Sequence, residues 1–153
     1  MSVTHDVPCP NCSEPMTMYR NPAPAVDMVI YDSVRGIVLI ERANEPHGWA
    51  LPGGFIDYGE TCEHAAIREA KEETNLDIVL TEIIGVYSDP DRDPRHHTMS
   101  VAYAAVAKDV SKISAGDDAQ KAKFFPLNSL PHIVFDHNKI VEDFVSRLNR
   151  LNK

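Results

Sequence analysis

Residues 53–76, GGFIDYGETCEHAAIREAKEETNL, constrain the fold and the chemistry of this chain more than any other segment. A glycine-rich loop leads into residues 64–74, which contain no glycine or proline, and Thr61 is suited to cap the start of a helix there. Asn75 suits the exit because asparagine tolerates the left-handed backbone that ends many helices. The segment therefore predicts a loop followed by a helix.

Acidic side chains gather on one side of this predicted helix. At about 100° per residue, Glu69 and Glu73 share a sector with the small residues of the helix, and Glu72 lies at its edge. An ordinary amphipathic helix would place leucine or valine in that sector. A solvated acidic face beside Arg68 is the simpler interpretation, but small residues pack closely against a sheet. We therefore favour a divalent cation, Mg²⁺ or Mn²⁺, held by carboxylate oxygens.

The spacing of this segment resembles the Nudix box, G-x5-E-x7-R-E-U-x-E-E-x-G-U, and the late glycine is replaced by Asn75. The resemblance implies an α/β fold, namely an α/β/α sandwich with a mixed β-sheet. It also implies hydrolysis of a nucleoside diphosphate linked to another moiety. The matching residues are Gly54, Glu60, Arg68, Glu69, Glu72, Glu73 and Leu76.

The resemblance implies a role for each box residue. Arg68 would orient the acids, and Glu60 or an acid of a later loop would take the proton of the attacking water. Asp118 is our candidate in that loop and Asp117 is nearly as good, although Gly-Asp-Asp is also common turn chemistry. The catalytic candidates are therefore Glu60, Arg68, Glu69 and Asp118, and the metal candidates are Gly53 (through its carbonyl), Glu69, Glu72 and Glu73.

The polar loop at residues 88–97 is predicted to bind the substrate. Arg92, Arg95 and His97 concentrate cationic or protonatable groups in an acidic chain, and a guanidinium group matches phosphate oxygens. Pairing of the arginines with aspartates of the same loop is the alternative. The loop is similar to the segment that follows the box in ADP-ribose pyrophosphatase-type Nudix enzymes, where a proline accompanies ADP-ribose use, and Pro90 is the candidate.

Residues 1–24 are predicted to be a leader separate from the hydrolase domain, residues 25–153. Cys9 and Cys12 have zinc-knuckle spacing, but no second Cys-x-x-Cys pair is present. We favour reduced, exposed thiols, and the alternative is a zinc site completed by His5 or by a second chain. The leader resembles the short zinc ribbon of some bacterial Nudix proteins. Residues 21–24, Asn-Pro-Ala-Pro, predict a stiff, extended connector.

The remaining pattern predicts a mixed sheet and a second helix. The predicted strands are residues 26–31, 36–41, 78–87, 98–107 and 123–127, and residues 137–151 predict an amphipathic helix. Residues 44–49 and 109–120 are expected to be loops. Trp49 is expected in the core, and His132 and His137 are expected at the helix cap or on the surface without a functional role.

Composition limits the partners of the chain. A formal net charge of −8 argues against nucleic acid, no apolar run suits a membrane span, and three cysteines do not suggest a secreted disulfide framework. We expect a cytoplasmic enzyme that hydrolyses a small nucleotide diphosphate with Mg²⁺, first of all ADP-ribose to AMP and ribose 5-phosphate. An NADH or dinucleotide polyphosphate pyrophosphatase and a nucleotide-sensing module are the alternatives. The resemblance also allows a homodimer.

Overall fold

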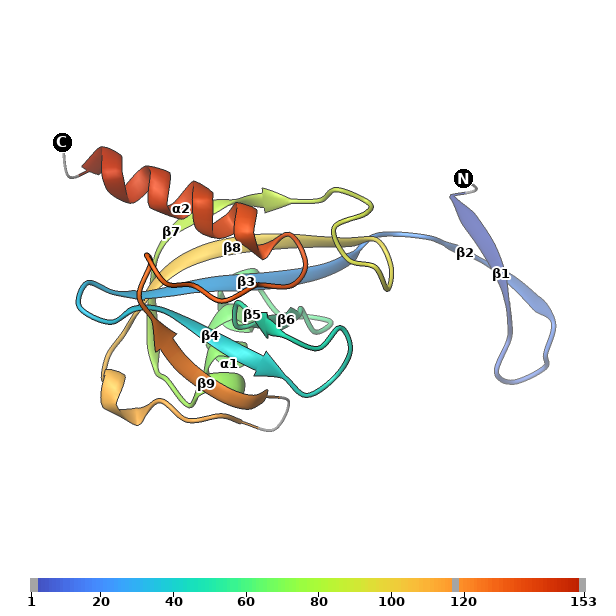
Figure 1. Cartoon of the computed structure of the whole chain (residues 1–153). Coiled ribbons are helices and arrows are strands. Elements are labelled where there is room, and N and C mark those ends of the chain that lie inside the picture. Colours follow the sequence, from blue (N-terminus) through green and yellow to red (C-terminus); the bar gives the residue numbers. More distant parts are fainter. Residues whose placement is uncertain (1–2, 117–118, 152–153) are drawn as a thin grey trace.

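A seven-stranded mixed sheet lies between two helices in the computed structural model, which describes residues 3–116 and 119–151 (Figure 1). The sheet contains β3 (Ala23–Asp32), β4 (Gly36–Arg42), β5 (Trp49–Ala50), β6 (Gly53–Phe55), β7 (Ile78–Tyr87), β8 (Thr98–Ala107) and β9 (Ala119–Phe125). The helices are α1 (Cys62–Thr74) and α2 (His137–Leu151), with a short 3₁₀ turn, η1 (Val110–Lys112), between β8 and β9.

The strand order in the sheet is β5-β4-β3-β8-β7, with β6 also paired to β3 and β9 also paired to β4. The β3–β8 pair is parallel, and the other pairs are antiparallel. The α/β fold with a mixed sheet is therefore confirmed. Because β6 pairs with β3 and leads into α1, the glycine loop lies against the central strand.

Side-chain alternation along β3 assigns one core to each face of the sheet. Val26, Met28 and Ile30 pack with the alanines of α1, whereas Val29 packs with the apolar face of α2. This two-residue period also turns Asp27 toward the α2 side, where it is buried. The sandwich therefore places a carboxylate in its core directly beside the glycine loop.

Helix α1 begins and ends as its sequence predicts. The side chain of Thr61 accepts a hydrogen bond of 3.2 Å from the backbone N–H of His64. Asn75 has a left-handed backbone with φ of 58°, and its N–H donates to the carbonyl of Lys71. Both contacts satisfy backbone groups that a helix end leaves without partners.

Several predicted boundaries were wrong. Ala23 and Pro24, which we expected in a connector, begin β3 and pair with Thr98 and Met99 of β8. Strand β9 begins at Ala119, before the predicted residue 123, and η1 interrupts the loop expected at residues 109–120. Short strands β5 and β6 replace chain that we expected to be irregular. Each of the strand segments is ordered by a neighbouring strand, which a local pattern does not report, whereas the side chain of Asp109 caps η1.

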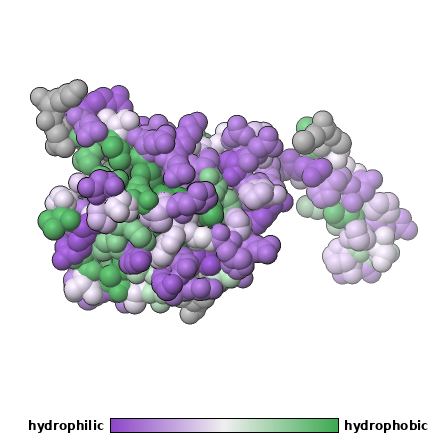
Figure 2. Space-filling model, viewed as in Figure 1, coloured by the Kyte–Doolittle hydropathy of each residue, from purple (hydrophilic) through white to green (hydrophobic). Residues whose placement is uncertain are grey.

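The leader forms a hairpin of β1 (Thr4–Pro8) and β2 (Pro15–Tyr19), which the sequence did not predict. It projects from the body as a separate lobe (Figures 1 and 2). Within the described part of the chain, β1 and β2 pair only with each other. No helix within residues 3–116 and 119–151 is long and apolar enough to cross a membrane.

Candidate active site

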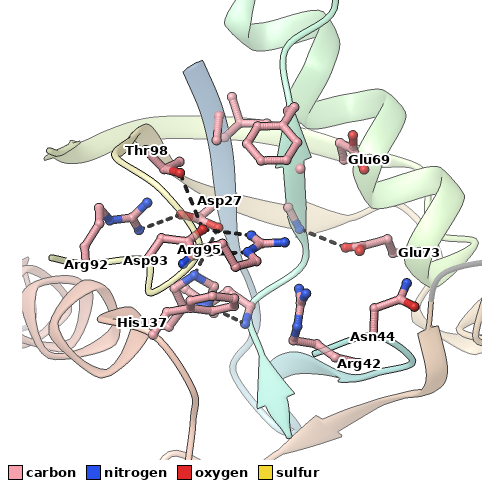
Figure 3. Close-up of a pocket in the computed structure, with 17 residues that line it drawn as sticks. Asp27, Arg42, Asn44, Glu69, Glu73, Arg92, Asp93, Arg95, Thr98 and His137 are labelled. Carbon is pink, nitrogen blue, oxygen red and sulfur yellow. Dashed lines mark hydrogen bonds and ion pairs between the residues drawn. The ribbon is translucent and has the colours of Figure 1, made fainter. Parts of the chain in front are cut away.

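A pocket of about 260 Å³ opens where β6, the C-terminal half of α1 and the loop after β7 meet (Figure 3). Carboxylates, guanidinium groups and aromatic rings all reach it, so charges of both signs and an apolar wall share one space. The functional side chains that line it are Asp27, Arg42, Asn44, Phe55, Glu69, Glu73, Arg92, Asp93, Arg95, Thr98, Phe135 and His137, together with Gly53 and Gly54.

Glu73 is the most deeply buried acid of α1. Its Oε2 atom accepts a 2.8 Å hydrogen bond from the backbone N–H of Gly53. The pKa of this carboxyl is raised to about 8, mainly by burial; the hydrogen bond from Gly53 opposes this effect and the nearby Glu69 adds to it. The pocket therefore contains a carboxyl group whose negatively charged form is disfavoured in this structure.

Glu69 lies one turn earlier on the same face of α1. A Cβ atom added to Gly54 would collide with the Glu69 carboxylate, so the absence of a side chain at Gly54 makes room for that acid. Burial raises the pKa of Glu69, although Arg68 opposes this effect. Two acids thus reach the pocket with their charged forms disfavoured.

Arg68 links the acids of the glycine loop to those of the helix. Its Nε and Nη2 atoms donate to the two oxygens of Glu60 at 2.9 and 2.8 Å. Its Nη1 atom donates to Glu69 at 2.8 Å and to Glu72 at 3.1 Å. The hydrogen bond from Arg68 is the main cause that lowers the pKa of Glu60 to about 2, so Glu60 is a weak proton acceptor in this arrangement.

The donor chemistry of α1 fits a hard divalent cation. Glu69 and Glu73 supply carboxylate oxygens whose pKa values are raised mainly by burial, and the exposed Glu72 lies beside them on the helix. Within the described residues, however, no three acidic, histidine or cysteine side chains converge as metal ligands. Arg68 accounts for this arrangement, because it holds Glu72 and Glu69 on its own guanidinium group.

Arg92 lies in the pocket lining but is committed to two aspartates. Its Nη2 atom contacts Asp136 at 2.7 Å and Asp27 at 3.2 Å, and its Nε atom donates to Asp136. Neither Asp27 nor Asp136 lies in the loop at residues 88–97, whose aspartates were the partners expected in the alternative interpretation. Because the Arg92 side chain is only 4% exposed, its guanidinium group serves to join the loop, β3 and the chain before α2.

His137 completes this buried network and was wrongly expected to cap the helix or lie on the surface. Its Nδ1 atom accepts a 3.0 Å hydrogen bond from the Leu51 backbone, so Nε2 is the nitrogen that faces Asp27 at 3.3 Å. Burial raises the pKa of Asp27, but contacts with His137 and Arg92 outweigh it and hold the pKa at about 2. Asp27 therefore stays charged in the core.

Arg95 and two phenylalanines form an aromatic and cationic wall. The Arg95 guanidinium carbon lies 5.9 Å from the Phe55 ring centre and 5.4 Å from that of Phe135, while Arg42 lies 4.9 Å from Phe135. Arg95 also forms a two-point ion pair with Asp93, as the alternative interpretation of this loop expected. Phe135 has φ of 60°, a backbone conformation that bulky residues rarely adopt.

The other predicted site residues lie elsewhere. Pro90 and His97 are exposed residues outside the pocket lining, and His97 contacts the Ser88 carbonyl. Asp117 and Asp118 lie outside the described residues. Trp49 packs edge-on against Phe125 at 4.8 Å in the core, as expected.

Sequence reasoning missed several pocket residues, namely Asp27, Arg42, Asn44, Phe55, Thr98, Phe135 and His137. Asp27 carried a signal, because a charged residue within an apolar strand must be paired when it is buried. Phe55 lies within the glycine segment, so its nearness to the box was the only indication of a role. Arg42 is the last residue of β4, and its sequence position gave no indication of a role. Nothing local identified Phe135, because its position depends on the chain fold between β9 and α2.

The hairpin that carries the two leader cysteines projects from the body that contains this pocket (Figure 1). Both are free thiols; Cys9 is half-buried and Cys12 is exposed. The backbone N–H groups of Asn11 and Cys12 hold the pKa of the Cys9 thiol below its usual range.

Two characterised proteins are similar to this chain in sequence. The ADP-ribose pyrophosphatase of Methanocaldococcus jannaschii is 48% identical over 132 residues, which cover 84% of this chain and 76% of that protein. The ADPR responsive transcriptional repressor NtrR of Acinetobacter baylyi is 29% identical over 143 residues, which cover 86% of this chain but only 56% of the repressor.

A solved structure shares the fold. The NUDIX domain of Shewanella oneidensis NrtR, crystallised with ADP ribose, superimposes with a TM-score of 0.73 at 27% identity. The similarity covers 85% of this chain and 90% of that one. The NUDIX domain profile matches residues 21–144, which include the whole pocket and α1. The chain therefore belongs to the Nudix family.

Proposed function

We propose that the protein hydrolyses ADP-ribose to AMP and ribose 5-phosphate, with Mg²⁺ or Mn²⁺ bound by Glu69, Glu72 and Glu73 and the Gly53 carbonyl. One observation carries the proposal. A single pocket contains acids whose charged forms are disfavoured by burial, and they lie near a wall of guanidinium groups and aromatic rings. A nucleoside diphosphate ester requires both parts, since its phosphates need cations and its base needs an apolar surface. The similarity to an ADP-ribose pyrophosphatase supports this choice of substrate.

The residues of the chain divide the work of hydrolysis. The divalent cation, when bound, neutralises phosphate charge and lowers the pKa of a water molecule. Arg68 orients Glu60, Glu69 and Glu72, so that acids of like charge remain close together. Arg42 and Arg95 present guanidinium groups to the diphosphate, Arg42 while it donates to the Glu45 and Pro46 carbonyls and Arg95 while it pairs with Asp93. Phe55 and Phe135 receive the base.

The attacking water must lose a proton when the phosphorus–oxygen bond forms. Glu60 is disfavoured as the acceptor, because Arg68 holds its pKa at about 2. We therefore favour Asp118, with Asp117 as the neighbouring alternative. Gly116 supports this assignment, since its N–H donates to the Glu73 carbonyl at 3.1 Å and ties the preceding chain to α1.

Arg92 is proposed as a positioning residue. Its contacts with Asp27 and Asp136 hold the loop that presents Arg95 to the pocket. Pro90 and His97 remain substrate-binding predictions that rest on the loop pattern alone.

A hydrolysis panel tests the substrate. ADP-ribose, NADH, diadenosine polyphosphates and nucleoside triphosphates would each be incubated with the protein and Mg²⁺, with products separated by chromatography. We expect ADP-ribose to give the highest kcat/KM, with AMP and ribose 5-phosphate in equal amounts. Preference for NADH or a diadenosine polyphosphate would instead assign the alternative pyrophosphatase activity.

A nucleotide-sensing role is the second candidate, and the similarity to the ADPR responsive repressor favours it. Calorimetry with ADP-ribose separates the two. Tight binding without turnover of any substrate in the panel would identify a sensor, whereas turnover at a low Mg²⁺ concentration supports the enzyme. We also propose a cytoplasmic location, where its nucleotide substrates occur.

A further inference from the structure

The leader hairpin requires an explanation that the hydrolase pocket does not provide. It precedes the matched NUDIX domain, and it projects from the body that contains the pocket (Figure 1). Residues 9–14 connect β1 to β2 and carry both thiols at the tip of the hairpin.

The backbone of this tip forms a tight knuckle. The N–H of Ser13 donates to the Cys9 carbonyl at 2.9 Å, and the N–H of Cys9 donates to the Glu14 carbonyl at 2.8 Å. Ser13 adopts a left-handed φ of 62°, which lets the chain reverse direction immediately after Cys12. A redox Cys-x-x-Cys pair begins a helix, but this pair joins two strands, so its setting is that of a metal knuckle.

One copy of the chain supplies too few ligands for a structural zinc site. Zinc in such sites takes four ligands, and the knuckle offers two thiolates. No group of three His, Cys, Asp or Glu side chains within residues 3–116 and 119–151 is arranged to hold a metal. His5, which pairs with Met18 along the strands, therefore does not complete the site.

The hairpin also leaves an apolar face open. Val7 pairs with Met16 and His5 pairs with Met18, so the two methionines lie on one face with Val7. Met16 is 39% exposed and Met18 is 47% exposed. Two-stranded sheets are marginally stable alone in water, and such small folds depend on metals or oligomerisation.

A second copy of the chain would supply the two missing zinc ligands and would also cover the open apolar face. We infer that one Zn²⁺ ion joins two copies of this chain, with Cys9 and Cys12 of each copy as its four thiolate ligands. The thiol protons pass to solvent when the metal binds. A second hairpin packed on the first covers the methionine face, and the hydrolase bodies remain outside the contact. The leader is therefore a zinc-dependent dimerisation element.

Metal content and mass test this inference on the full chain. The protein would be purified under reducing conditions, loaded with Zn²⁺ and dialysed against Mg²⁺, which occupies carboxylate sites. Elemental analysis should find one zinc ion per two chains, and light scattering after gel filtration should find a dimer. Replacement by Co²⁺ should produce the visible absorption bands of tetrahedral thiolate coordination.

Cysteine variants provide the control. Cys9→Ser and Cys12→Ser should each yield a zinc-free monomer, whereas Cys62→Ser, at the start of α1, should retain both zinc and the dimer. Thermal unfolding of the body should be unchanged in Cys9→Ser and Cys12→Ser, which separates this result from any failure of the proposed hydrolysis. One zinc ion per monomer, no bound zinc in the intact chain, or a dimer that survives Cys9→Ser would each overturn the inference.

Discussion

The backbone N–H of Gly53 donates a 2.8 Å hydrogen bond to Oε2 of Glu73, which joins the glycine loop to the last turn of helix α1. A carboxylate in this position is buried, and its pKa is raised to about 8. A glutamine can accept the same hydrogen bond without a charge. Replacement of Glu73 by glutamine therefore keeps the hydrogen bond to Gly53 and removes the charge, which distinguishes the structural role of this side chain from its role in binding the metal.

Glu73→Gln should lower turnover by orders of magnitude and stabilise the metal-free protein. A folded-state pKa above the unfolded value means that stability falls as pH rises from about 4.5 toward 8. The variant lacks this loss, so its Tm without metal at pH 7 should be higher by about 5 °C. Thermal unfolding between pH 5 and pH 9, with and without Mg²⁺, measures the effect. Glu72→Gln, at an exposed acid of the same helix, is the control for the metal-free Tm alone and should not raise it. Equal Mg²⁺-induced stabilisation of Glu73→Gln and wild type would contradict the metal assignment.

Gly54→Ala should cost at least about tenfold in kcat while the protein stays folded, because its Cβ would displace the Glu69 carboxylate. Steady-state kinetics measures the loss in kcat, and circular dichroism shows whether the protein stays folded. Gly85→Ala is the control, since the three atoms nearest to a Cβ there belong to the Tyr87 side chain, at ordinary contact distances of 3.4 to 3.6 Å. An unchanged kcat in Gly54→Ala would show that the position of Glu69 does not matter.

Arg68→Lys should lower kcat by at least about tenfold, because a single ammonium group cannot hold the three carboxylates that the guanidinium fork contacts. The concentration of Mg²⁺ needed for half-maximal activity should change as well. Arg35→Lys, which alters an exposed turn arginine paired with Asp32, should leave both quantities unchanged. If Arg68→Lys retains full activity, charge alone is sufficient at this position.

Phe135→Leu should raise the KM for ADP-ribose about tenfold, since stacking of a base on an aromatic ring contributes about 1–3 kcal/mol. The effect on kcat should be small, because the ring is proposed to contact the base and not the reacting phosphate. Tyr19→Leu removes an exposed aromatic ring of the leader and serves as the control. A fall in kcat at constant KM would remove Phe135 from the base-binding site.

Asp27→Asn should destabilise the fold by about 3 kcal/mol, because it leaves the buried Arg92 with one charged partner. The folded-state pKa of Asp27, about 2, is below its ordinary value of 3.8, so its stabilisation exists above pH 4 and is lost as pH falls toward 2. Urea unfolding of both proteins at pH 7 and pH 3 should therefore give a smaller difference at pH 3. A difference that is independent of pH would exclude the ionised Asp27 as its source.

The placement of the box glycines and acids could be predicted because it depends on residues that are close together in the sequence. Glu69 and Glu73 are four residues apart, so a helix places them on one side whatever surrounds it. The cap at Thr61 and the exit at Asn75 follow from the same short-range chemistry. Strand β3 was recognisable from its apolar run, although its first residues were not, since they are ordered by β8.

The sequence by itself therefore determined the box, the helix that carries it, the main strands and the reaction class that they imply. Only the tertiary structure decided the partners of groups that meet from distant parts of the chain. Arg92 faced several nearby aspartates in the sequence, yet it pairs with Asp27, which lies 65 residues away, and with Asp136. His137 is likewise buried by its contacts with Leu51 and Asp27. A side chain that can pair with any of several groups selects the partner that packing brings within reach, and packing is a property of the whole fold.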